Sequence, residues 1–144
     1  MSDRAPATHR FPLRVYYEDT DAAGVVYYAN YLKFAERART EMMRAAGADH
    51  AGLAAAHGVA LTVRRCEIDY LRPARLDDLI EVETRILEVG GAAVDGEQVI
   101  RRDGVDLARI RVRLACVDQA GRATRLPAPL RAALARYCQL QERV

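Results

Sequence analysis

The sequence has 144 residues, with 22 basic against 20 acidic side chains, a formal net charge of +2 and 51% hydrophobic residues. This length fits one domain that buries about two-thirds of its unfolded surface, so we interpret residues 1–144 as a single unit with about the first ten residues (1–10) as a flexible N-terminus. The balanced charge argues against a nucleic-acid partner, and no segment reaches the roughly 20 apolar residues that cross a bilayer, so no transmembrane segment is expected.

The first predicted elements are a short strand and a long helix. Residues 13–17 have β-character and lead into a polar turn at 18–24. Asn30 suits the N-cap of a helix, and Gly47 is a natural end for it. Between them, apolar residues recur three and four positions apart, as on the buried face of a helix. These are Tyr31, Phe34 or Ala35, Ala38, Met42 and Ala45.

The rest of the chain has mainly β-character. In residues 59–71 the alternation of apolar positions shifts by one residue near Arg64 and Arg65, which predicts a β-bulge or a strong bend. The other expected elements are a short helix at 49–57, strands at 79–89, 92–101 and 105–118, turns at 90–91 and 103–104, and a short helix after Pro129. This order predicts an α+β domain in which an antiparallel sheet covers one long helix, because each buries the apolar face of the other.

The strand at 105–118 shows the clearest alternation. One face carries Ala108, Ile110, Val112, Leu114 and Cys116, and the other carries Arg109, Arg111 and Arg113. We therefore expect one buried and one solvated face. A sheet of this kind has open edges, which proteins commonly cover by oligomerisation, so a symmetric homodimer is expected.

Rare residue types restrict the chemistry. Ser2 is the single serine, which argues against a serine nucleophile and a P-loop. Lys33 is the single lysine, and its place on a predicted helix surface argues against a Schiff base. Cys66, Cys116 and Cys138 are odd in number and widely spaced, which is typical of a reducing compartment, so a cytoplasmic location is expected.

Residues 16–31 combine carboxylates, a glycine and five tyrosines at the junction between strand and helix. Free N–H groups at a helix start can hold the oxyanion that develops from a thioester carbonyl, and a nearby carboxylate can attack the carbonyl or deprotonate water. Alternatively, Asp19-Thr20-Asp21 only caps a turn through its own backbone. A calcium loop is a weaker interpretation because Ala23 and Asn30 occupy ligand positions.

Residues 15–41, VYYEDTDAAGVVYYANYLKFAERARTE, resemble the signature of the YbgC-type acyl-CoA thioesterases, which are associated with the Tol-Pal system and related to the 4-hydroxybenzoyl-CoA thioesterases. The similarity continues through residues 63–65 and 70–78. The resemblance implies a hot-dog fold and hydrolysis of short-chain acyl-CoA. It also implies homodimers or dimer-of-dimers tetramers with sites at the subunit interface, without a metal or other cofactor.

The same resemblance assigns the site residues. Asp21 matches the family's catalytic carboxylate, Tyr17 an active-site tyrosine, and the backbone N–H near Tyr28 the oxyanion position. Many members have histidine at this last position. A tyrosine hydroxyl with a reference pKa of about 10 is a poor base, so Tyr28 is expected to shape the pocket or donate a hydrogen bond. The expected substrate-binding residues are Gly24, Val25, Val26, Tyr27, Arg64 and Arg65.

Several alternatives stay open. The carboxylate can act as nucleophile or as general base, and the thioester can belong to CoA or to an acyl carrier protein. Rival functions are a non-catalytic acyl-carrier or Tol-Pal-associated scaffold and a 3-hydroxyacyl thioester dehydratase, which would need a histidine that the motif lacks. CoA phosphates have further candidate partners in Arg72, Arg75 and the arginines of the strand at 105–118. The three histidines, His9, His50 and His57, are expected on the surface.

Overall fold

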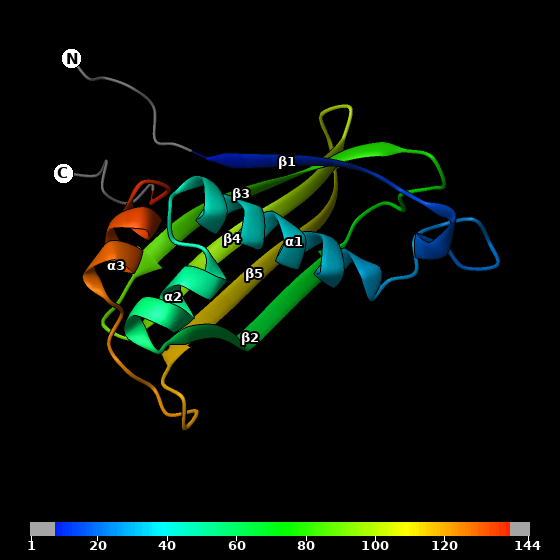
Figure 1. The fold of residues 1–144 in the computed structure, drawn as a ribbon. Coiled ribbons are helices and arrows are strands. Elements are labelled where there is room, and N and C mark those ends of the chain that lie inside the picture. Colours follow the sequence, from blue (N-terminus) through cyan, green and yellow to red (C-terminus); the bar gives the residue numbers. More distant parts are fainter. Residues whose placement is uncertain (1–7, 139–144) are drawn as a thin grey trace, which may run out of the picture.

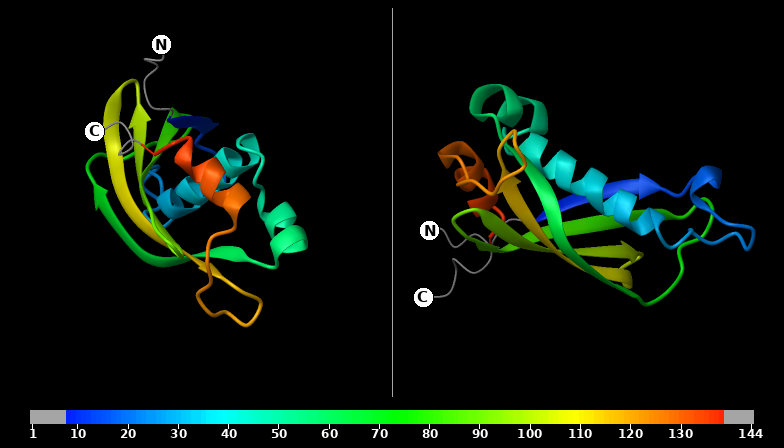
Figure 2. Two further views of the ribbon diagram at one scale, coloured as in Figure 1. Left: turned by 90° about the vertical axis from the view of Figure 1, so that its left-hand side faces the viewer. Right: turned by 90° about the horizontal axis from the view of Figure 1, so that it is seen from below.

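The computed structural model describes residues 8–138, which form one five-stranded sheet and three helices (Figure 1). The elements in chain order are β1 (His9–Arg14), a 3-10 turn at Tyr17–Asp19, α1 (Asn30–Ala45), α2 (His50–His57), β2 (Ala60–Tyr70), β3 (Leu79–Val89), β4 (Ala93–Arg102), β5 (Val105–Val117) and α3 (Ala128–Ala135). All neighbouring strands are antiparallel, and α1 lies across the concave face of the sheet (Figure 2). The predicted α+β hot-dog arrangement is confirmed.

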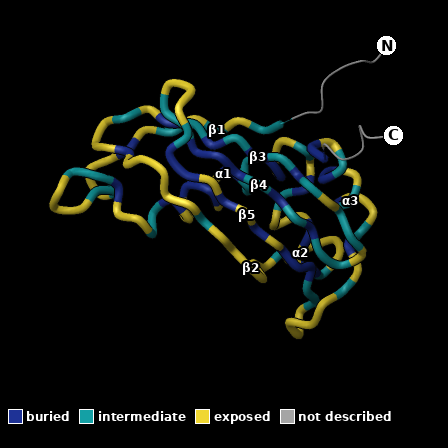
Figure 3. Tube along the Cα trace, turned by 180° about the vertical axis from the view of Figure 1, so that it is seen from behind, coloured by how far each residue is buried: buried dark blue, intermediate teal, exposed yellow. Residues whose placement is uncertain are grey.

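The strands do not follow chain order across the sheet. Their order is β1-β3-β4-β5-β2, so β2 pairs only with β5 and forms one edge. Nine of the eleven residues of β2 are exposed, and the strand runs along the open side of the molecule (Figure 3). The register against β5 shifts between Val63 and Arg65, which confirms the predicted bulge and places Arg64 in it.

The core lies between α1 and the inward side chains of the sheet. Alternation along β5 is as predicted, because its even-numbered positions from Ala108 to Cys116 are buried and the arginines between them are exposed. On α1 the structure buries Met43 and leaves Ala45 exposed. Met43 packs in a cluster with Leu53 of α2 and Leu130 of α3, so these two helices cover a second face of α1 that its own periodicity did not indicate.

The first strand differs from its prediction. It begins at His9, which pairs with Thr84, and ends at Arg14, whereas residues 17–19 form the 3-10 turn. Two residues assigned to a flexible N-terminus therefore belong to the sheet, because pairing with β3 extends the strand beyond its own apolar pattern; residues 1–7 lie outside the described part. Within residues 8–138, no helix has the length and apolar character needed to cross a membrane.

Candidate active site

The loop between β1 and α1 is a tight hairpin that presents Asp21. Thr20 and Val26 form an antiparallel bridge, and the N–H of Asp21 donates to the carbonyl of Val25 at 2.9 Å. The N–H of Gly24 returns to the carbonyl of Asp21 at 3.0 Å. Gly24 has a φ of 79°, in the left-handed region that glycine adopts without a steric penalty. The turn therefore requires a glycine three residues after the aspartate.

Asp19 anchors this hairpin to the helix. Its carboxylate accepts the N–H of Tyr16 at 2.8 Å, and its carbonyl accepts the N–H of Tyr27 at 3.0 Å and Asn30 Nδ2 at 2.9 Å. The prediction that Asn30 is the N-cap is wrong. Asn30 is the first residue of α1, and Ala29 precedes it without a side-chain cap. Because its amide holds the loop carbonyl, Asn30 fixes the hairpin instead of capping the helix.

The Asp21 side chain is exposed, and only one of its two carboxylate oxygens accepts a hydrogen bond within residues 8–138. Its Oδ1 accepts the N–H of Ala23 at 2.8 Å, which is the turn-capping interaction that the sequence left open. Its Oδ2 accepts no hydrogen bond from residues 8–138. One oxygen thus orients the carboxylate while the other remains available to a substrate or a water molecule. The turn role and a chemical role are therefore compatible.

The start of α1 carries available backbone donors, among them the N–H groups of Tyr28 and Ala29. The N–H groups of Tyr27 and Asn30 are bonded to the carbonyls of Asp19 and Tyr27. Those of Tyr28 and Ala29 have no acceptor in the part of the chain that the structure describes. These two N–H groups lie at the positive end of the helix dipole, so they can stabilise negative charge on a carbonyl oxygen.

Tyrosine rings connect the helix start to the end of β2. Tyr70 contacts Tyr31 and Tyr28 edge to face, with ring centroids 5.5 and 6.1 Å apart, and its hydroxyl donates to the carbonyl of Tyr28 at 3.0 Å. The buried Tyr31 hydroxyl accepts the N–H of Ala74 at 2.9 Å. The ring of Tyr27 lies 4.9 Å from that of Tyr28. Contacts between aromatic rings therefore join the end of β2 to the loop that precedes α1 and to the first turn of α1.

Several of these phenols have raised pKa values. Burial raises the pKa of Tyr31 and of Tyr70. The adjacent Tyr28 side chain raises the pKa of Tyr27, first by hydrogen bonding and then by charge. All three phenols therefore stay protonated at neutral pH and can donate hydrogen bonds but not accept protons as bases. Tyr17 and Tyr28 are 82% and 61% exposed.

The structure gathers most of the predicted site residues at this hairpin. Gly24, Val25 and Tyr27 lie in it beside Asp21, and Val26 is buried in the core, so that its side chain anchors the loop. Val25 also bridges to Arg75, which is exposed. Among the arginines considered for phosphate binding, Arg75 therefore has its backbone directly beside the hairpin that carries Asp21.

Arg64 and Arg65 are in a different environment. Arg64 is the exposed bulge residue of β2. Arg65 donates to Glu67 at 2.6 Å and shares an outer-face depression of the sheet with Arg111 and Arg113. This face points away from α1, so the structure does not bring Arg65 to the hairpin.

Within residues 8–138, no three His, Cys, Asp or Glu side chains form a candidate metal site.

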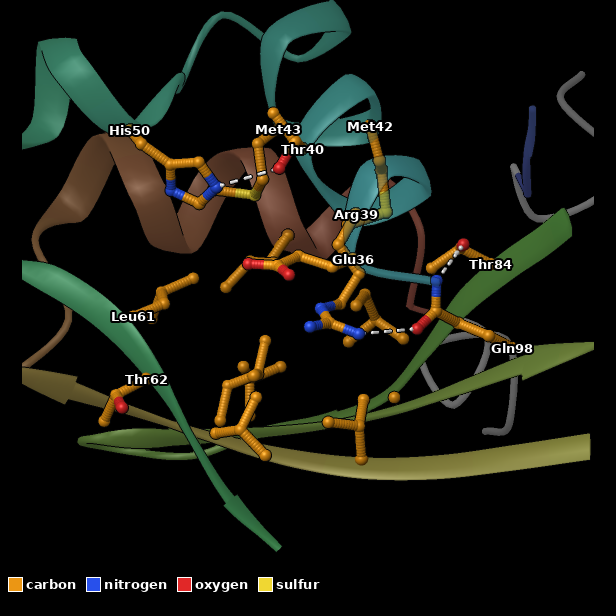
Figure 4. Close-up of a pocket in the computed structure, with 17 residues that line it drawn as sticks. Glu36, Arg39, Thr40, Met42, Met43, His50, Leu61, Thr62, Thr84 and Gln98 are labelled. Atoms are coloured by element: carbon orange, nitrogen blue, oxygen red, sulfur yellow. Dashed lines mark hydrogen bonds between the residues drawn. The ribbon is translucent and has the colours of Figure 1, made fainter. Parts of the chain in front are cut away.

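A cavity of about 340 Å³ lies under the second half of α1 (Figure 4). The polar side chains that line it include Glu36, Arg39, His50 and Gln98, and most of its remaining wall is aliphatic. None of residues 16–31 lines it. No local sequence pattern indicates this cavity, because the side chains that form it come from α1, α2, α3 and four strands.

Comparison with known proteins identifies the family. The model of the thioesterase-like superfamily matches residues 15–134. The chain belongs to this superfamily. Acyl-CoA thioesterase YbgC of Haemophilus influenzae is 49% identical over 108 residues, which cover 75% of this chain and 79% of that protein. Acyl-CoA thioester hydrolase YbgC of Escherichia coli O6:H1 is 44% identical over 110 residues, covering 76% and 81%.

A solved structure agrees with these relatives. The crystal structure of a probable thioesterase from Bartonella henselae is 40% identical and superposes with a TM-score of 0.80, covering 84% of this chain and 100% of that one. The predicted resemblance to YbgC-type thioesterases is therefore confirmed at the level of family and fold.

Proposed function

We propose that the protein is an acyl-CoA thioesterase in which Asp21 supplies the catalytic carboxylate. The proposal is carried by one observation: the Asp21 carboxylate has one oxygen without a hydrogen bond in the described chain, and its hairpin leads directly into the available N–H groups of Tyr28 and Ala29 at the start of α1. These are a carboxylate and an oxyanion site, the two elements that thioester hydrolysis needs. The YbgC relatives, named as acyl-CoA thioesterases, support the same assignment.

The chemistry can follow two balanced routes. In one, the N–H groups of Tyr28 and Ala29 hold the carbonyl oxygen while Asp21 takes a proton from water. The resulting hydroxide attacks the carbonyl carbon, the C–S bond breaks, and the thiolate leaves and takes up the proton. In the other, Asp21 attacks the carbonyl itself, and water later opens the acyl anhydride. In both, Tyr17 is a hydrogen-bond donor to the substrate and the Tyr28 side chain shapes the pocket.

The proposal includes a homodimer formed through β2. This strand has an unpaired edge, and edges of this length favour pairing with another chain. Val63 and Tyr70 on it are 49% and 46% exposed. An antiparallel pair of β2 strands would continue the sheet across two subunits and cover these side chains. A monomeric mass by light scattering would contradict this assembly, and the mass of a tetramer would indicate a dimer of dimers.

Other parts of the proposal depend on the family resemblance. They are a short-chain acyl group, CoA phosphates bound by exposed arginines, a cytoplasmic location and an association with the Tol-Pal system. Arg75 has the strongest support among the arginines because its backbone adjoins the hairpin. The thiols of Cys66, Cys116 and Cys138 are free, which agrees with a reducing compartment. An acyl carrier protein is the alternative donor of the thioester.

Thiol release from acyl-CoAs of short, medium and long chains and from aromatic acyl-CoAs tests the function. We expect Asp21→Asn to lower the rate by about 10²- to 10⁴-fold, as when a catalytic acid or base is removed. Glu18→Gln is the matched control, because it neutralises another exposed carboxylate of the same loop and should keep the wild-type rate. Full activity of Asp21→Asn would contradict the mechanism. If wild type cleaves neither acyl-CoA nor carrier-protein thioesters, the protein is a scaffold instead.

A further inference from the structure

The two N–H groups assigned to the oxyanion belong to peptide units whose carbonyls are bonded in different ways. The N–H of Tyr28 shares its peptide unit with the carbonyl of Tyr27, which accepts the backbone N–H of Asn30 at 2.8 Å. The N–H of Ala29 shares its unit with the carbonyl of Tyr28, which accepts the side-chain hydroxyl of Tyr70 at 3.0 Å. The backbone supplies the first of these bonds, whereas the second depends on one tyrosine side chain.

The irregular start of α1 explains why the Tyr28 carbonyl takes a side-chain donor. In a regular helix this carbonyl would accept the N–H of Leu32, four residues later. The N–H of Leu32 bonds instead to the carbonyl of Ala29 at 3.2 Å. Among residues 8–138, the hydroxyl of Tyr70 is the only donor to the Tyr28 carbonyl. It therefore replaces a bond that the helix backbone leaves out.

The position of Tyr70 is fixed by its neighbours in the sheet. It is the last residue of β2 and pairs with the buried Ala108 of β5. The next two N–H groups, those of Leu71 and Arg72, both bond to the carbonyl of the buried Leu107, at 2.8 and 3.1 Å. The edge-to-face ring contacts described above hold the side chain as well. The hydroxyl therefore approaches the carbonyl from a defined direction.

We propose that Tyr70 is a positioning residue of the oxyanion site, whose hydroxyl fixes and polarises the Tyr28–Ala29 peptide unit so that the N–H of Ala29 is a stronger donor. Hydrogen bonds that share a peptide unit polarise and strengthen one another. The gain increases as negative charge develops on the substrate oxygen, so the transition state is stabilised more than the bound thioester. This inference rests on the proposed thioester hydrolysis, in which Tyr70 acts only through the peptide unit.

Tyr70→Phe tests the inference, because it removes the hydroxyl and keeps the ring. Loss of a whole oxyanion donor costs about 10²- to 10³-fold in kcat, so weakening one donor should lower kcat by about tenfold. KM for acyl-CoA should stay within about twofold of wild type, whereas a role in substrate binding alone would raise KM and leave kcat unchanged. Tyr137→Phe is the matched control. It removes a phenol just after α3, where the ring contacts His9, and should keep the wild-type kcat.

The amide NMR signal of Ala29 gives a readout that does not depend on turnover. The nitrogen shift of an amide responds to hydrogen bonding at the carbonyl of the same peptide unit. Tyr70→Phe should therefore move the Ala29 nitrogen signal to lower frequency, and Tyr137→Phe should leave it in place. Light scattering should give the wild-type mass for both variants, which separates the effect from subunit pairing through β2.

Tyr70→3-fluorotyrosine keeps both the ring and the hydroxyl, so it serves even if Tyr70→Phe fails to fold. Its phenol is more acidic, and a phenolate cannot donate, so kcat should fall at a lower pH than in wild type. The groups that interact with this phenol by charge, Tyr28, Tyr31 and Cys66, are the same in both proteins. An unchanged alkaline limb of the pH profile would therefore contradict the inference.

The remaining outcomes separate this inference from the proposed function. An unmoved Ala29 signal in Tyr70→Phe, or a kcat within about twofold of wild type, overturns the role of Tyr70 alone. If wild type cleaves no thioester, the proposed function fails and this inference fails with it. A tenfold loss of kcat with unchanged KM and a shifted Ala29 signal is the result that supports both.

Discussion

The two halves of α1 hold their polar groups in opposite ways. At its start, the carboxylate of Asp21 is held by the N–H of Ala23, two residues away, and the side chains of Asp21, Tyr17 and Tyr28 remain exposed. In the second half, Arg39 is held by Gln98, 59 residues away, and Gln98 is fully buried. Exposed groups that are held locally can be replaced at little cost in stability. Groups that join distant elements of the core cannot.

The sharpest test of this contrast is Gln98→Ala. It leaves a void beside Arg39 and removes partners of buried polar groups, so the free energy of unfolding should fall by about 3 kcal/mol. Asp21→Asn should change it by less than about 0.5 kcal/mol, because its site is exposed. Urea denaturation measures both. Gln119→Ala, at an exposed glutamine, is the control and should match wild type. Equal losses for Gln98→Ala and Asp21→Asn would refute the contrast.

Removal of the hydrogen bond that anchors the hairpin to α1 should have an intermediate effect on stability. Asn30→Ala removes the hydrogen bond to the carbonyl of Asp19, which is partly buried, so we expect a loss of about 1 to 2 kcal/mol in unfolding free energy. Thiol release should fall as well, because the hairpin then holds Asp21 less firmly. Asn30→Asp keeps the size but lacks the amide donor. If Asn30→Asp is as stable as wild type, the amide bond is not the anchor.

Glycine-to-alanine substitutions at two positions with the same backbone conformation test the hairpin, with a smaller expected effect on stability. Gly24 and Gly47 have φ values of 79° and 80°, and an added Cβ would meet nothing within 4 Å at either position. Alanine should therefore cost about 1 kcal/mol at both, from backbone strain alone. Activity should fall in Gly24→Ala only, because Gly47 ends α1 far along the chain from Asp21. Equal activity of the two variants would show that the hairpin conformation does not position the carboxylate.

The sequence predicted features that depend on local periodicity. The alternation of β5, the bulge at Arg64 and the end of the long helix before Gly47 each arise from neighbouring residues, and all three are confirmed. The motif resemblance likewise placed Asp21 and the helix start together. These features require no knowledge of which elements become neighbours in space.

Contacts between segments far apart in the sequence leave no trace in the local pattern. Nothing in the local pattern indicates that β2 lies at the sheet edge, or that Arg39 meets Gln98. His50 is exposed, as expected, yet it also lines the cavity. Asn30 was assigned as a cap because asparagine commonly caps helices, and the competing carbonyl of Asp19 became apparent only in the folded loop. The cavity was missed because its wall combines several separate elements.

The smallest expected effect concerns Tyr28. Tyr28→Phe should change thiol release by less than about threefold, because the proposed oxyanion donor is the backbone N–H, which phenylalanine retains. The same variant removes the group that raises the pKa of Tyr27, so Tyr27 should titrate at lower pH in an ultraviolet titration. Tyr28→His should instead add an inflection near pH 6.5, roughly the reference pKa of histidine, to the pH-rate profile. If Tyr28→Phe folds but loses turnover, the phenol takes part in the reaction, and the chemistry of the helix start depends on a side chain as well as on the backbone.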